Sequence, residues 1–305
     1  MGWQSSVPNE SVIWFYSKVN MPQLGLSFAR SRFEAFKLCA YGARVGLSLS
    51  AKGLIADALK TAIYPVGYWR FVASAYLLSY ASKIRGGRVL DVASPKLASL
   101  YLASKHNFDV QAIDLDDPKI FSRWKVAADV LKLENYNVSF QDARQLQFPD
   151  NHFDFVYSIS VIEHIPEDGD ARALNEFRRV LKPGGIALLE VPYRRTFETI
   201  YRPYSSKGTP SPDGKPVFYE RHYDFCSLDK RLSVSGMIVE KRLILGEWLP
   251  VDPLIATRRL PRAIRVAILP FEPLLAAGNY WTRVDDKKGR PLAALLVYRK
   301  NLLTT

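Results

Sequence analysis

Hydrophobic and polar positions between residues 88 and 192 follow two periods that alternate along the chain. Short, mostly apolar runs of the length of buried strands alternate with longer stretches whose apolar residues recur on one helical face. The pattern predicts helices that end near Lys105, 133 and 181. It predicts strands at 89–92, 110–114, 137–140, 153–158 and 186–191. Such alternation is typical of a parallel sheet that is covered by helices on both faces.

The segments on either side of this alternation extend the picture. Polar, turn-rich residues 1–25 predict a loose arm, and one-face apolar spacing then predicts three helices, at 26–48, 53–63 and 68–84. After the alternation, two more strands are predicted, at 237–245 and 292–298. We therefore divide the chain into three parts: a helical N-terminal extension (1–85), a core (86–193) and a C-terminal part (194–305).

Composition and charge narrow the function classes. With 48% hydrophobic and 24% charged residues among 305, the chain has the composition of a folded globular protein. The net charge of +12 lies in the two flanks, because residues 86–192 are acidic on balance. Such flanks could face nucleic acid, an anionic membrane surface or an acidic substrate, or they could simply be solvated.

Two absences in the sequence also shape the expectations. Cys39 and Cys226 form neither a disulfide framework nor a metal-ligand spacing, which predicts a reducing, cytoplasmic setting and no metal site. No uncharged apolar stretch of about 18 residues is present, so no membrane-spanning helix is expected.

Candidate chemistry follows the predicted strands, because ligands of parallel sheets bind at the carboxyl ends of the strands. Asp114 ends the second strand, about 23 residues after Asp91, where an acid can accept hydrogen bonds from both ribose hydroxyls of a nucleoside. Asp142 follows the third strand, where its carboxylate can accept from an adenine amino group while the Ala143 N–H donates to the ring. Each acid taken alone could equally be a surface aspartate that caps a helix or a loop.

Four sequence motifs in a fixed order carry a resemblance to a known family. The motifs are Phe-Gln-Asp-Ala (140–143), Phe-Pro-Asp-Asn-His-Phe-Asp-Phe-Val (148–156), Val-Ile-Glu-His-Ile (161–165) and Leu-Asn-Glu-Phe-Arg-Arg-Val-Leu-Lys-Pro-Gly-Gly (174–185). Over residues 86–193 the chain resembles class I, Rossmann-like S-adenosylmethionine-dependent methyltransferases of the ubiquinone/menaquinone-biosynthesis-like type. These proteins act mainly on small molecules.

The resemblance implies a fold, a cofactor and a set of site residues. The fold is α/β: a doubly wound, mainly parallel seven-stranded sheet of order 3-2-1-4-5-7-6 with strand 7 antiparallel, a helical N-terminal extension and an enlarged C-terminal cap over the substrate site. The cofactor is S-adenosylmethionine. Its implied contacts are Asp91, Ala93, Ser94, Lys96, Asp114, Leu115, Asp142, Ala143 and Ser158. Implied substrate contacts in the variable region after the fifth strand are Tyr193, Tyr219 and His222.

The loop after the first strand departs from the family's acid-x-Gly-x-Gly-x-Gly pattern, because all three glycines are replaced. The chain has Ala93 and Pro95 there, and proline fixes φ and removes an N–H donor. Either the loop takes another course, with Ser94 and Lys96 contacting the cofactor carboxylate, or cofactor binding is lost. We favour retained binding because both acids at the strand ends remain, and this interpretation requires both to face one crevice.

The expected chemistry is an in-line displacement at the cofactor methyl group, in which the enzyme mainly aligns the acceptor. A hydroxyl acceptor also needs a base, for which His164 is the first candidate and Glu163 the second. Alternatively, both residues only shape the loop after the fourth strand. That loop reads Ser-Ile-Ser-Val (158–161) instead of the Asn/Asp-Pro-Pro-aromatic run of base amino-methyltransferases, so nucleic acid is not expected as the acceptor.

The connection between the last two predicted strands, about residues 246–290, is far longer than a hairpin. It interleaves basic and apolar residues: Arg258, Arg259, Arg262 and Arg265 with Ile268, Phe271, Leu274 and Leu275. This pattern suits an interfacial helix that brings the site to a lipid-linked acceptor, but also a homodimer contact or core packing. The sequence thus predicts methyl transfer to a small molecule, with O-methylation of a lipidic or glycan-type acceptor favoured. The alternatives are a non-catalytic methyltransferase-like binding protein and, behind it, an RNA methyltransferase.

Overall fold

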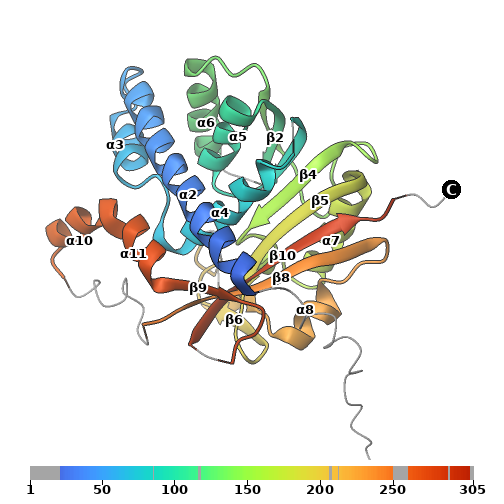
Figure 1. Ribbon diagram of the computed structural model, residues 1–305. Coiled ribbons are helices and arrows are strands. Elements are labelled where there is room, and N and C mark those ends of the chain that lie inside the picture. The colour runs from blue at the N-terminus through green and yellow to red at the C-terminus, as the bar shows by residue number, and fades with distance from the viewer. Residues whose placement is uncertain are drawn as a thin grey trace, which may run out of the picture.

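The computed structural model describes residues 21–302, apart from 85, 116, 117, 206, 207, 212, 250–259 and 288. An eight-stranded sheet of order β3-β2-β1-β4-β5-β10-β8-β9 runs through the molecule, with helices on both of its faces (Figure 1). The strands are β1 (Gly87–Val92), β2 (Phe108–Asp114), β3 (Tyr136–Phe140), β4 (Phe153–Ile159), β5 (Leu181–Pro192), β8 (Met237–Glu247), β9 (Tyr280–Arg283) and β10 (Arg290–Lys300).

The sheet confirms the predicted topology. Strands β1 to β5 are parallel, and β10 lies antiparallel between β5 and β8. Since β10 and β8 are the seventh and sixth strands of the core fold, the order 3-2-1-4-5-7-6 is as predicted. The edge strand β9, which pairs antiparallel with β8, was not predicted.

Helices of the core and of the N-terminal extension pack into two hydrophobic clusters. The helices are α2 (Met21–Ser50), α3 (Ile55–Ile63), α4 (Tyr68–Ala81), α5 (Lys96–His106), α6 (Pro118–Val130) and α7 (Gly169–Val180). Helices α2 to α6 contribute to one cluster, with buried side chains such as Leu38 of α2, Phe71 of α4 and Phe155 of β4, and α7 contributes to the second one. Helix α2 begins at Met21, within the stretch predicted as a loose arm, whose first 20 residues lie outside the described part. Among the described helices, none combines the length and apolarity needed to cross a membrane.

The C-terminal part adds a separate hairpin and a helical insertion. The hairpin consists of β6 (Glu198–Arg202) and β7 (Val217–His222), and α8 (Phe225–Arg231) follows it. The insertion after β8 contains α10 (Arg262–Ile268), η2 (Leu269–Phe271) and α11 (Glu272–Asn279). Neither the hairpin nor α8 was predicted from the sequence.

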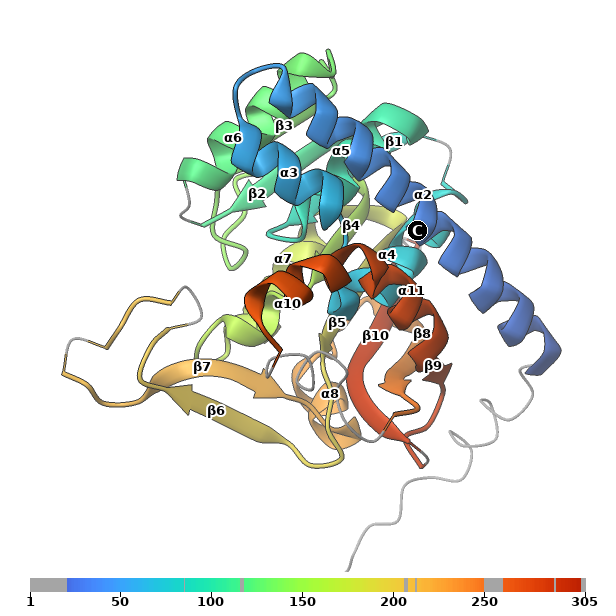
Figure 2. The ribbon, with the colours of Figure 1, turned by 90° about the vertical axis from the view of Figure 1, so that its left-hand side faces the viewer.

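Helix α11 packs against the N-terminal extension (Figure 2), so half of the insertion serves the core. At the first turn of α4, the Tyr68 N–H donates to Glu272 Oε2 at 3.0 Å. The Tyr68 hydroxyl accepts from Asn279 Nδ2 at 2.6 Å. Both acceptor and donor on α11 are more than nine-tenths buried, which makes this contact a structural joint between two segments distant in sequence.

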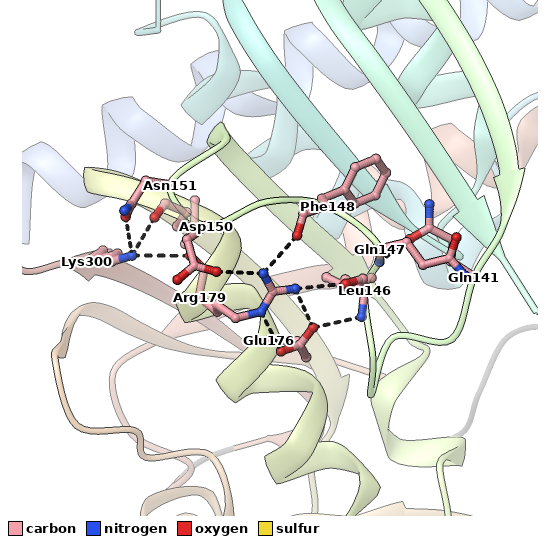
Figure 3. Close-up of polar contacts among 10 residues, drawn as sticks. Gln141, Leu146, Gln147, Phe148, Asp150, Asn151, Glu176, Arg179 and Lys300 are labelled. Carbon is pink, nitrogen blue, oxygen red and sulfur yellow. Dashed lines mark hydrogen bonds and ion pairs between the residues drawn. The ribbon is translucent and has the colours of Figure 1, made fainter.

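Arg179 of α7 fixes the loop between β3 and β4, which carries the candidate residues 142 and 143 (Figure 3). Its guanidinium donates to the backbone carbonyls of Leu146 and Phe148, both at 2.8 Å. It also pairs with the carboxylates of Asp150 and Glu176 at 2.8 Å. Arg179 and Glu176, both in the fourth motif, therefore have a structural role, because they hold the loop against α7.

Candidate functional site

The β1–α5 loop keeps the backbone course of a glycine loop without its glycines. Ala93 has φ of 50°, in the left-handed region, which costs a residue with a Cβ about 1–2 kcal/mol. Its N–H donates to the Ile113 carbonyl at 2.9 Å, and the Ser94 N–H donates to Asp91 Oδ1 at 2.9 Å. Pro95, next in the loop, has no N–H. The loop therefore closes on the ends of β1 and β2 through its own amides.

Asp91 and Lys96 form a buried ion pair beneath this loop. Lys96 Nζ lies 3.2 Å from Asp91 Oδ1 and 3.1 Å from the Ile113 carbonyl oxygen, and both side chains are almost completely buried. Burial raises the pKa of Asp91, while the Lys96 ammonium acts against that rise. The lysine thus ties the carboxyl ends of β1 and β2 together.

The Ser94 hydroxyl joins β1 to β4. It donates to the Val92 carbonyl at 3.2 Å and accepts from the Ile159 N–H at 2.9 Å. Together with the ion pair of Lys96, this changes the picture drawn from the sequence. Ser94 and Lys96 were expected to contact the cofactor carboxylate, but their side chains bond to protein groups instead. In these positions they stabilise the loop that lacks the usual glycines.

A cavity of about 460 Å³ lies between this loop and the N-terminal extension. One wall includes Ala93 and Asp114, and the opposite wall comes from the α3–α4 region, with Tyr64 and Arg70. Asp114 is half-buried, and its Oδ1 accepts from the N–H of the exposed Leu115 at 2.8 Å. The volume suits a ligand of drug or cofactor size. Asp114 therefore lies at a cavity beyond the end of β2.

Asp142 is arranged differently from Asp114. Arg144 holds its carboxylate with two nitrogens, Nε at 3.0 Å and Nη2 at 2.7 Å from Oδ2. The side-chain hydrogen bonds from Arg144 lower the pKa of Asp142. Asp142 is not among the residues that line the cavity, and Ala143 is buried. The requirement that both acids face one crevice is therefore not met, because only Asp114 lines the cavity and Arg144 holds the Asp142 carboxylate. The support that this pair gave to cofactor binding reduces to Asp114 alone.

His164 lies in the single turn η1 (Ile162–His164) that follows β4. Its Nδ1 is 2.8 Å from the Tyr219 carbonyl oxygen. A carbonyl oxygen can only accept, so Nδ1 carries the hydrogen and Nε2 holds the lone pair of the neutral ring. Nε2 lies 3.7 Å from Glu163 Oε1 and 3.8 Å from Glu220 Oε2, beyond hydrogen-bonding distance. The ring, with 27% of its side chain exposed, is oriented by a backbone group and keeps one basic nitrogen.

Glu163 is the buried neighbour of this histidine. The residue is completely buried, and burial, with the nearby Glu190, raises its pKa well above the ordinary value. A protonated carboxyl group that reaches no solvent can neither contact an acceptor nor take its proton. The structure therefore argues against Glu163 as a base, and it leaves His164 as the candidate.

The three predicted substrate contacts separate into two groups. The Tyr219 ring meets the His164 ring edge-on at 5.5 Å, and His222 Nε2 lies 2.9 Å from Glu220 Oε1, so both residues gather around His164. Tyr193 is buried, and its hydroxyl donates to Asp286 Oδ2 at 3.0 Å. It therefore serves packing at the end of β5 instead of the site. Ser158, on β4, is buried as well.

Two further residues were not singled out from the sequence: Glu220, which lies near His164, and Arg70, which lines the cavity. Glu220 lies between the two histidines; burial alone would raise its pKa, but the hydrogen bond from His222 and the charges of nearby histidines lower it. Arg70 donates to the Ile159 carbonyl at 2.9 Å. Glu220 lay within the aromatic run 218–224, but no sequence pattern pointed to Arg70, because its place depends on how α4 packs on β4.

Comparison with known proteins agrees with this geometry. Residues 90–189 match the family model described as "Methyltransferase domain". A phosphatidylethanolamine N-methyltransferase of Cereibacter sphaeroides is 36% identical over 102 residues, which are 33% of this chain and 48% of that protein. A probable S-adenosylmethionine-dependent methyltransferase of Mycolicibacterium smegmatis is 33% identical over 156 residues, 49% of this chain and 55% of that protein. The chain thus spans about half the length of these relatives.

A solved structure supports the fold alone. The crystal structure of MccD protein superposes with a TM-score of 0.50 at 19% sequence identity, covering 75% of this chain and 96% of that one. The cofactor that the matched domain implies is S-adenosylmethionine.

Proposed function

Because residues 90–189 form a class I S-adenosylmethionine-dependent methyltransferase domain, we propose that this chain transfers a methyl group to a small-molecule acceptor. The observation that carries the proposal is the cavity beyond β1 and β2, with Asp114 in its wall. There Asp114 would hold the cofactor ribose, and the Ala93 loop would lie against the ligand as a glycine loop does. When bound, the cofactor supplies an electrophilic methyl group on a sulfonium centre.

The proposed base favours a hydroxyl acceptor. His164 Nε2 would take the proton of the acceptor hydroxyl as the oxygen receives the methyl group that the cofactor supplies. Two features support this assignment: the hydrogen on Nδ1 is fixed by the Tyr219 carbonyl, and the ring is partly exposed. His222 and Tyr219 would then line the acceptor side, since the Tyr219 ring meets the His164 ring and both histidines approach Glu220.

Calorimetry with S-adenosylhomocysteine tests cofactor binding. We expect heat of binding for the wild type and at least about tenfold weaker binding for Asp114→Ala, which loses a charge-assisted hydrogen-bond acceptor. Asp109→Ala at the other end of β2 serves as the control and should bind normally. If the wild type gave no heat at high protein concentration, the alternative of a non-catalytic binding protein would be preferred, as the replaced glycines first suggested.

Methyl transfer from labelled cofactor tests the acceptor class. Two probes separate the cases: a phenolic hydroxyl compound, and phosphatidylethanolamine in mixed micelles, chosen because one relative is named for that lipid. We expect label on the hydroxyl acceptor and a fall in kcat of about 100-fold or more for His164→Gln, with unchanged affinity for S-adenosylhomocysteine. Label on the amine alone, with His164→Gln fully active, would exclude the proposed O-methylation and the base.

We further propose that the insertion docks on an anionic lipid surface, which would present a lipidic acceptor to a cytoplasmic, peripherally bound enzyme. Helices α3 and α10–α11 lie on the same side of the molecule (Figures 1 and 2). Exposed apolar side chains on these elements are Ile55, Leu59, Ile264, Val266, Phe271 and Leu274. Arg262 and Arg265, on the same short helix, complement an anionic surface in charge.

Sedimentation with vesicles tests this docking. The wild type should pellet with phosphatidylglycerol vesicles but not with phosphatidylcholine vesicles. Phe271→Glu with Leu274→Glu should abolish pelleting, whereas Ile238→Glu, at an equally exposed apolar position on β8, should not. Unchanged pelleting of the double variant would refute the docking.

A further inference from the structure

In the β1–α5 loop, the backbone amides that could meet the cofactor's amino-acid carboxylate are already used. The Ala93 N–H donates to Ile113, the Ser94 N–H donates to Asp91, and Pro95 has none. A carboxylate in a partly buried cavity needs a cation or several donors, because an unpaired charge is costly there. Donors for the carboxylate must therefore come from outside residues 93–95.

Four cationic residues line the cavity: Lys60, Arg70, Lys96 and Arg123. The three besides Arg70 have different partners. Arg123 Nη1 binds Asp57 Oδ1 at 2.8 Å, and its guanidinium stacks on Trp124. Lys96 is committed to the ion pair beneath the loop. Lys60 is exposed at the cavity wall, on α3. The fourth cation of this wall, Arg70, is half-buried and lies at the end of β4.

Arg70 contacts the same residue, Ile159, that binds the Ser94 side chain of the loop. Its Nη1 donates to the Ile159 carbonyl at 2.9 Å, while the Ile159 N–H donates to Ser94 Oγ. A guanidinium has five N–H donors, so this single bond leaves donors for a ligand. Its acidic neighbours Glu163 and Glu190 have pKa values raised by burial, which favours their neutral forms and weakens their compensation of its charge.

The position of Arg70 also matches the length of the ligand. Asp114 ends β2 and Arg70 lies at the end of β4, and β1 separates these two strands in the sheet. Two strand spacings amount to roughly 10 Å. That distance is comparable with the extended chain that joins the ribose to the amino-acid carboxylate of the cofactor.

We infer that Arg70 binds the amino-acid carboxylate of S-adenosylmethionine and replaces the donors that the altered glycine loop has lost. The inference rests on the proposed function and deepens it. The planar guanidinium would bind the carboxylate with two parallel hydrogen bonds, as arginine does in other carboxylate sites. In this chain a residue of the N-terminal extension therefore takes over one task of the core loop.

Calorimetry with two ligands tests the inference. S-adenosylhomocysteine carries the carboxylate, whereas 5′-methylthioadenosine keeps the nucleoside and the sulfur but lacks the amino-acid part. For Arg70→Met we expect about 10- to 100-fold weaker binding of S-adenosylhomocysteine, the effect of removing a hydrogen bond to a charged group. Binding of 5′-methylthioadenosine should change less than about threefold. Arg88→Met, which removes the same charge at the start of β1, should bind both ligands as the wild type does.

The outcomes separate this inference from the proposed function. Wild-type protein that binds neither ligand would overturn both. Normal binding of S-adenosylhomocysteine by Arg70→Met, or an equal loss for both ligands, would overturn the role of Arg70 alone, because the residue would then act only by holding Ile159. Arg70→Lys keeps the charge but not the fork, and it should bind S-adenosylhomocysteine with intermediate affinity. If Arg70→Met fails to fold, the comparison of the two ligands on Arg70→Lys decides.

Discussion

Replacing Glu163 with glutamine removes a titratable group from the core and keeps the shape of the side chain. In the wild type the residue is completely buried, and neither carboxyl oxygen makes a hydrogen bond within the described part of the chain. Burial, with a contribution from Glu190, raises the pKa of Glu163 well above its usual value of 4.5. The folded protein therefore holds a proton there that the unfolded chain releases at neutral pH.

The sign and size of the effect follow from this proton. When the pKa of a carboxyl group is raised in the folded state, the free energy of unfolding falls as the pH rises from the unfolded-state pKa toward the folded-state pKa. One extra proton bound in the folded state gives a slope of about 1.4 kcal/mol per pH unit. Glutamine does not titrate, so Glu163→Gln should gain about 1.4 kcal/mol over the wild type between about pH 5.5 and 6.5. Any difference in packing between the amide and the carboxyl group changes the free energy of unfolding by an amount that does not depend on pH.

Urea unfolding followed by circular dichroism at several pH values measures this difference. Glu134→Gln, at an exposed position, is the matched control and should give a difference that does not depend on pH. A flat difference for Glu163→Gln would refute the reasoning. It would mean that the carboxyl group is ionised in the folded state, with a protonated His164 as its partner.

Three further changes test the framework of the site by urea unfolding. Arg179→Met should lower the free energy of unfolding by about 2 kcal/mol, because two carbonyls and a carboxylate lose their donor. Arg172→Met, on the exposed side of the same helix, should have little effect. Equal losses for the two variants would contradict the role of Arg179. Ala93→Gly should be neutral or should stabilise the protein by up to about 1 kcal/mol, because glycine adopts the left-handed conformation without strain. Ala98→Gly, within α5, should cost about 1 kcal/mol or more. A loss of stability at both positions would argue against strain at Ala93. Glu272→Gln should cost about 1 kcal/mol, because it removes a negative charge from the N-terminus of α4, and an unchanged midpoint would show that the joint with α11 is unimportant.

The core of the fold could be predicted because its strands are buried on both faces. Mostly apolar runs such as 89–92 and 186–191, each with a single acidic residue, are typical of the middle of a covered sheet, and the motifs fixed their order. The hairpin of β6 and β7 escaped prediction since most of its residues are half-exposed, so no strict alternation marks it. The edge strand β9 is four residues long, too short for a pattern.

The site was predictable only where its residues lie at the ends of core strands. Asp114 and His164 could be located because strand ends converge in a parallel sheet. The basic residues that determine what such strand-end residues can do could not be located in this way. The grip of Arg144 on Asp142 and the pair of Lys96 with Asp91 depend on side-chain directions in loops, and Arg70 depends on the packing of a helix outside the core.

The joint between α4 and α11 has a consequence for synthesis on the ribosome. The carboxylate that caps α4 lies 204 residues after the amide it binds. At translation rates of about 5–20 residues per second, the extension emerges roughly 10–40 s before this partner. During that interval α4 has no cap, and its apolar face lacks the cover that α11 provides. Helix α4 therefore depends on α11, which is synthesised much later. Chaperones would bind the uncovered apolar face of α4 while the nascent chain is still growing.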